Sequence, residues 1–190
     1  MQIILKLHTE LTRKAEHFFL FFPFTSKTTI KAMTSVPLSK MRILNKDEFF
    51  NFIELNITGD NQNFNKCDGE SKFIDVDIFN IFAACFEASN PLFEFYGNTK
   101  YNSRNIIRLN NELQELKKKI ELIESKDQLT EFLNDLFLGQ DLIDEFKSHY
   151  IDWEKNWNNI KEILLVFNAD ITKLIDKCIS EDRVLWVLGI

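Results

Sequence analysis

Two carboxylates, Asp75 and Asp77, stand one residue apart directly after the apolar residues Phe73 and Ile74. A pair with this spacing after a hydrophobic strand can bind Mg²⁺, because hard cations prefer carboxylate oxygens. Two apolar residues are too few for such a strand, and the residues that follow have helical spacing. We therefore interpret Asp75 as the N-cap of a helix and Asp77 as a favourable charge in its first turn.

The other residues that commonly bind metals or act as nucleophiles are dispersed along the chain: His8, His17, His149, Cys67, Cys85 and Cys178. None of them has the spacing of a zinc site. His149 follows Glu145 by four residues, and such a pair can act as base and orienting group, but no nucleophile can be placed opposite it. We therefore predict no catalytic residue, no metal site and no cofactor. The odd number of cysteines without a C-x-x-C pair favours a reducing cytosol.

Residues 57–72 are polar and rich in turn formers, with Asp68-Gly69 as the sharpest turn signal. Counted from Asp60, a calcium-binding EF-hand loop would need Gly at its sixth position and Glu at its twelfth. Those positions hold Asn65 and Ser71. We therefore expect an ordinary surface loop here.

The chain of 190 residues has 29 acidic against 23 basic residues, and their distribution is uneven. Residues 1–40 hold six basic and two acidic residues, so residues 41–190 carry the whole excess of negative charge. A protein that binds DNA or RNA directly gathers Lys and Arg on one face, so we expect no nucleic-acid partner. No apolar run reaches the roughly 20 residues of a membrane-spanning helix.

The basic segment 1–40 has three interpretations. Its apolar stretch from His17 to Phe24 is short for a secretory signal and is interrupted by Pro23. Met33 and Met41 are internal starts, so the segment can also be a mis-called extension, or a loosely attached arm. We favour the arm or extension over the signal. The chain then consists of a basic leader, residues 1–40, and a single acidic helical domain, residues 41–190.

Helical spacing dominates this domain. Apolar residues at 106, 109, 113, 116, 120 and 123 form a heptad-like seam, and a second seam extends from Phe146 to Phe167. Each seam needs a packing partner because its apolar stripe is narrow. We expect helices to begin near Asn45, Asp75, Ser103, Ser125, Asp141 and Asp170.

The predicted fold class is therefore mainly α, an irregular antiparallel bundle of five or six helices. The sequence allows one small β-element in addition. Its strand would be Leu92–Tyr96, and Met41–Leu44 or Val184–Leu188 would pair with it.

Acidic residues are concentrated between Ser125 and Lys155, a segment that contains eight acidic and three basic residues as well as several aromatic ones. An acidic surface with aromatic anchors suits a basic protein partner, because charge speeds association and aromatic residues supply contact area. The residues predicted to bind this partner are Asp135, Asp141, Asp144, Glu145, Tyr150, Asp152 and Trp153. The alternative is that the tryptophans face the core and the acids only solvate two helices.

These observations favour a non-enzymatic, acidic, cytoplasmic binding protein. It would cap a basic protein such as a toxin, as immunity proteins and antitoxins do. An alternative is an enzyme whose site is assembled from the dispersed residues Asp75, Asp77 and His149. A third hypothesis is a helical homodimer with a structural role, formed through the seam from Ile106 to Ile123, so the sequence leaves monomer and homodimer both open.

Overall fold

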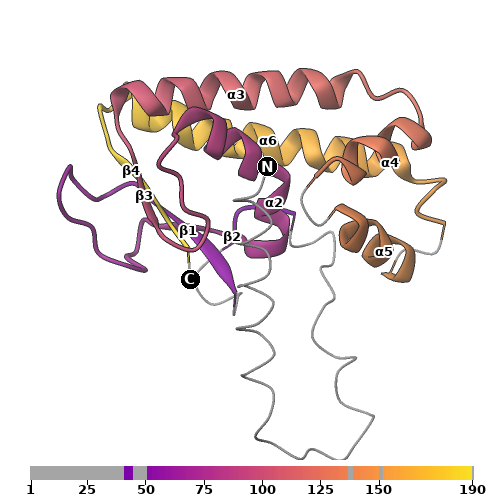
Figure 1. Cartoon of the computed structure of the whole chain (residues 1–190), viewed down its shortest axis with the longest axis horizontal. Coiled ribbons are helices and arrows are strands. Elements are labelled where there is room, and N and C mark those ends of the chain that lie inside the picture. Colours follow the sequence, from indigo (N-terminus) through magenta and orange to yellow (C-terminus); the bar gives the residue numbers. More distant parts are fainter. Residues whose placement is uncertain (1–40, 45–50, 137–138, 150–151, 190) are drawn as a thin grey trace, which may run out of the picture. The chain divides into compact units, whose positions relative to one another are not determined.

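The structure is a computed structural model that describes residues 41–44, 51–136, 139–149 and 152–189 (Figure 1). All of them belong to the second of the two units into which the chain divides, Ser35–Ile190. The basic leader lies outside the described residues, and its interpretation stays a prediction. Within the described part, no helix is both long enough and apolar enough to cross a membrane.

Within the described ranges, four short strands form one antiparallel sheet: β1 (Phe52–Asn56), β2 (Lys72–Asp75), β3 (Asn98–Tyr101) and β4 (Leu185–Leu188). Their order is β2-β1-β4-β3, so the strand latest in the sequence lies between β1 and β3. In this register Leu55 of β1 pairs with Lys72 on one side and with Val187 on the other. The strands of this sheet come from both ends of the described chain, and the helices lie between them in the sequence.

This sheet overturns the predicted fold class, a helical bundle with one small β-element. Phe52 and Ile53, which we expected in a helix starting near Asn45, belong to β1, and Leu92–Tyr96 is not a strand. Each strand has only four or five residues, too few for alternation to stand out, and β1 is buried almost throughout. Pairing such as that of Glu54 with Leu188 is also invisible to local periodicity.

The described residues form five helices: α2 (Val76–Ser89), α3 (Ser103–Glu121), α4 (Lys126–Asn134), α5 (Gly139–His149) and α6 (Trp157–Ser180). Two predicted caps are confirmed. The Asp75 carboxylate accepts a hydrogen bond from the backbone N–H of Asp77 at 3.1 Å, and Ser125 Oγ accepts one from the N–H of Gln128 at 3.3 Å. The predicted start at Asp170 is wrong, because Asp170 lies inside α6.

The seam from Ile106 to Ile123 is buried within this chain, and α3 packs along α6 (Figure 1). Cross-helix hydrogen bonds fix an antiparallel arrangement. Asn168 Nδ2 donates to the carbonyl of Leu113 at 3.1 Å, and Lys161 Nζ donates to the carbonyl of Ile123 at 2.7 Å. The narrow apolar stripe of α3 thus finds its partner in the same polypeptide.

A buried polar cluster fixes the loop between β1 and β2. Glu54 Oε1 accepts hydrogen bonds from Ser71 Oγ at 2.6 Å and from the backbone N–H of Cys67 at 2.8 Å. Asn56 Nδ2 donates to the Asn65 carbonyl at 2.9 Å and to Asp68 Oδ2 at 3.1 Å. The predicted surface loop is therefore tied to the sheet through side chains that β1 buries.

Candidate functional site

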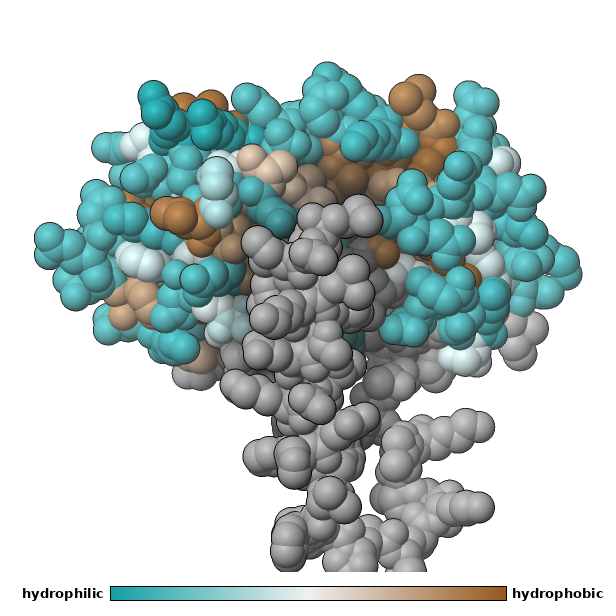
Figure 2. Space-filling view, viewed as in Figure 1, coloured by the Kyte–Doolittle hydropathy of each residue, from teal (hydrophilic) through white to brown (hydrophobic). Residues whose placement is uncertain are grey.

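The acidic residues predicted to bind a partner lie on three consecutive elements. Asp135 follows the last residue of α4, Asp141 and Asp144 lie on α5, and Asp152 lies in the turn before α6. All four side chains are exposed, and α4 packs against α5. In Figure 2 the part of the surface over α4 and α5 is mostly hydrophilic. We call these four residues the acidic surface.

Lysines neutralise only part of the acidic surface. Asp144 Oδ1 lies 3.4 Å from Lys147 Nζ, and Asp152 Oδ1 lies 3.1 Å from Lys155 Nζ. Asp135 and Asp141 have no ion-pair partner among the described residues. Exposed ion pairs of this kind are weak, so the surface keeps a negative potential.

The three remaining predicted contact residues have different positions. Trp153 is only 5% exposed, and its ring centroid lies 6.4 Å from that of Phe146. Its indole therefore packs in the core. Tyr150 lies outside the described residues, and Glu145 is described only as a backbone position of α5.

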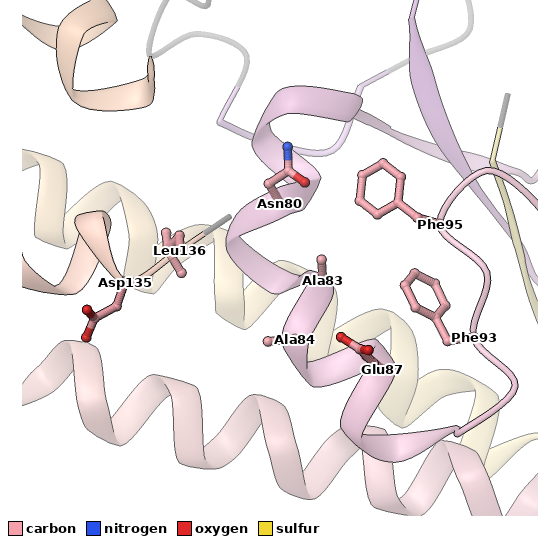
Figure 3. A pocket seen from close by; sticks show the side chains of 8 residues that line it. All are labelled: Asn80, Ala83, Ala84, Glu87, Phe93, Phe95, Asp135 and Leu136. Carbon is pink, nitrogen blue, oxygen red and sulfur yellow. The ribbon is translucent and has the colours of Figure 1, made fainter. Parts of the chain in front are cut away.

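A cavity next to the acidic surface contains aromatic side chains that sequence reasoning missed. It has a volume of about 330 Å³ and lies on one face of α2 (Figure 3). The eight residues that line it, here called the α2 groove, are Asn80, Ala83, Ala84, Glu87, Phe93, Phe95, Asp135 and Leu136. Asp135 is thus common to the acidic surface and the α2 groove.

The floor of the α2 groove follows from helical spacing. Asn80, Ala83, Ala84 and Glu87 recur at intervals of three and four residues, so they lie along one stripe of α2. The two alanines leave the helix backbone thinly covered, whereas most of the other apolar residues of α2 are large. In the sequence, only the two consecutive small residues Ala83 and Ala84, which lie among larger apolar residues of the same helix, indicated this groove.

The walls of the α2 groove come from outside the helix. Phe93 and Phe95 belong to the segment between α2 and β3, and Leu136 follows α4 (Figure 3). Contacts with the core hold the two rings in place. The Phe95 ring lies 5.7 Å from that of Phe79, and the Phe93 ring lies 6.1 Å from that of Phe86. Both phenyl groups are half-buried and turn part of their surface to the groove.

Polar groups are few in the α2 groove. Asn80 is 8% exposed, and its Oδ1 atom accepts no hydrogen bond from the residues that the structure describes. In Figure 3 this oxygen is turned toward the side of α2 on which Phe93 and Phe95 lie. Glu87 and Asp135 are exposed, and in the same view Ala84 lies between their carboxylates. The groove therefore combines apolar walls with hydrogen-bond acceptors.

Residues with nucleophilic chemistry lie elsewhere. Burial, with a contribution from Glu112, raises the pKa of Cys85 to about 12, and burial raises the pKa of Cys178 to about 11. Both thiols are therefore protonated at neutral pH and react slowly. Asp75 serves as a helix cap, and the side chain of His149 lies outside the described atoms. Within the described part of the chain, no three His, Cys, Asp or Glu side chains form a group that could hold a metal ion.

Comparisons with known proteins give no relative for this chain: no protein-family model matches it, and neither a curated protein nor a solved structure is significantly similar.

Proposed function

We propose that this chain is a non-enzymatic binding protein that caps a basic protein partner through its acidic surface, in the manner of immunity proteins and antitoxins. The observation that carries the proposal is that Asp135 and Asp141 are exposed and have no ion-pair partner in the described structure. Their charge is available to a partner.

The physical argument concerns association more than affinity. Negative charges on neighbouring elements attract a basic protein over about a Debye length, roughly 8–10 Å at physiological salt. Such steering raises the association rate and rejects acidic competitors. The α2 groove supports the proposal further, since a surface formed by charge alone gives little affinity, while apolar contact area beside the charge adds it.

Charge reversal on α5 tests the proposal. We expect Asp141→Lys with Asp144→Lys to leave folding intact because both side chains are exposed. The matched control is Glu162→Lys with Asp170→Lys, which makes the same change in net charge on the exposed face of α6. Wild type and both variants are immobilised and incubated with a cell extract at low salt. The proteins that each retains are identified by mass spectrometry.

The proposal predicts a basic protein that wild type and the α6 variant retain and that the α5 variant loses. Its association rate with the α5 variant should be about tenfold lower at low salt, and the difference should shrink as salt rises. Equal retention by both variants would show that the acidic surface only solvates the helices. The absence of any retained basic protein would reject the proposal altogether.

A further inference from the structure

The carboxamide oxygen of Asn80 indicates what the α2 groove is suited to bind. This oxygen has less than 1 Å² of accessible surface, and no donor among the described residues reaches it. The side chain that carries it is one of those that line the groove. More than nine in ten buried polar groups in folded proteins have a partner, so an unused acceptor in a cavity calls for a donor from a ligand. That ligand must present an N–H or O–H group at the Asn80 end of the groove.

The remaining lining restricts the ligand further. Between Asn80 and Glu87 the floor consists of Ala83 and Ala84, and the walls are the rings of Phe93 and Phe95. Seven residues of helix span about 10 Å, so the groove is elongated and apolar along its length. The carboxylates of Glu87 and Asp135 are exposed at its margin and favour a positive charge.

A guanidinium group on an aliphatic stem meets all three conditions. It carries five N–H donors in a plane, it is always charged, and it stacks on aromatic rings. The three methylene groups of an arginine side chain suit the alanine floor. An ammonium group offers donors and charge but no flat face, so lysine should bind less well. A purely apolar side chain would leave the Asn80 oxygen without a partner.

We propose that the α2 groove binds an arginine side chain of the basic protein partner. The stem lies along Ala83 and Ala84, and the Asn80 side chain turns to present Oδ1 to the guanidinium. The charge of Glu87 and Asp135 attracts the arginine and the basic residues around it. This inference rests on the proposed function. Asp135 links the two, because it belongs both to the acidic surface and to the groove.

A pair of short peptides tests the proposal on the full chain. The first is acetyl-Gly-Arg-Gly-amide, and the second replaces arginine by citrulline, which has nearly the same shape but no charge. Each is titrated into ¹⁵N-labelled protein, and amide shifts are followed by NMR. We expect the arginine peptide to bind with a millimolar Kd and to shift the side-chain amide of Asn80 and the backbone amides of Ala83 and Ala84. Citrulline should bind at least tenfold more weakly.

Variants of Asn80 separate the acceptor from the shape of the groove. Asn80→Leu should weaken binding of the arginine peptide at least fivefold, whereas Asn80→Asp keeps an acceptor oxygen and should retain binding. A thermal melt of each variant shows that it is folded. Equal binding of the arginine and citrulline peptides would overturn the proposal, as would shifts confined to Asp141 and Asp144, or equal binding by Asn80→Leu and wild type.

These outcomes are distinguishable from failure of the proposed function. If the groove variants bind the arginine peptide like wild type while partner retention still depends on Asp141 and Asp144, only the docking mode is rejected. If the peptide binds in the groove but no basic protein depends on the acidic surface, the groove remains an arginine site and the proposed function is rejected.

Discussion

Four asparagines are buried among the described residues, and two of them, Asn56 and Asn80, differ in how their side chains are hydrogen-bonded. Asn56 lies beneath the loop between β1 and β2, has no exposed surface and is hydrogen-bonded through both side-chain polar atoms. Asn80 lies in the α2 groove, almost as deeply buried, and its oxygen has no hydrogen-bond partner in the described part of the chain. The comparison suggests that the first region is complete as folded, whereas the second leaves an acceptor for a ligand.

The difference has a local cause. Asn56 stands where β1 ends, so the following loop brings unpaired backbone groups within reach, and its Oδ1 accepts from the N–H of Gly59 at 3.0 Å. Asn80 stands inside a helix, where backbone N–H groups are used by the helix itself. Its neighbours along the groove are alanine and phenylalanine, which carry no side-chain donor.

The largest effect on stability should come from removing the side chain of Asn56, whose two polar atoms are both hydrogen-bonded. Asn56→Ala leaves the Asn65 carbonyl and the Gly59 N–H without their side-chain partner, so we expect the free energy of unfolding to fall by about 2–3 kcal/mol. Urea denaturation measures this change. Asn61→Ala, an exposed position in the same loop, should change it by less than about 0.5 kcal/mol. Similar values for both variants would mean that the cluster does not hold the loop.

An effect of opposite sign is expected in the α2 groove. Asn80→Leu replaces a buried acceptor that has no partner among the described residues with an apolar side chain of similar size. The free energy of unfolding should stay unchanged or rise by up to about 1 kcal/mol. Denaturation under the same conditions as for Asn56→Ala gives a direct comparison. A loss above about 1 kcal/mol would show that Asn80 has a structural partner in solution.

The smallest effect concerns pH. Burial alone would raise the pKa of Asp68, but hydrogen bonds from Thr58, Ser71 and the backbone N–H of Glu70 outweigh it and hold the pKa below its ordinary value of 3.8. Asp68 therefore stabilises the folded chain above about pH 4, and this contribution is lost as the pH falls through its lowered pKa.

Asp68→Asn should consequently lose less stability than wild type between pH 7 and pH 3. Denaturant titrations at the two pH values give the difference, and all other carboxylates are common to both proteins. An equal loss in both would show that the hydrogen bonds to Asp68 do not favour its charged form. The Asn80 side chain does not ionise, so the stability of Asn80→Leu should have the same pH dependence as that of wild type.

Local sequence signals predicted the helices well where short-range physics controls them. The caps at Asp75 and Ser125 and the apolar seam of α3 follow from spacing within one or two turns. The sheet could not be predicted in this way, because β1 and β4 pair across most of the domain and contain polar residues such as Glu54 that are buried in the loop cluster.

The candidate site was only partly predictable for the same reason. Charge counting located Asp135, Asp141, Asp144 and Asp152, because exposed acids need no tertiary information. The α2 groove combines three separate segments, so no window of sequence contains it. Trp153 shows the limit of composition as a guide: it stands among acidic residues, yet its indole belongs to the core.

The position of β4 has a consequence for biosynthesis. A ribosome delivers β1, β2 and β3 before β4, yet β4 lies between β1 and β3. Until residues 185–188 emerge, β3 has no neighbouring strand and one edge of β1 is unpaired, for a period on the order of ten seconds at ordinary translation rates. Open strand edges recruit other chains. The nascent polypeptide therefore has an open edge at β1 until its sheet closes.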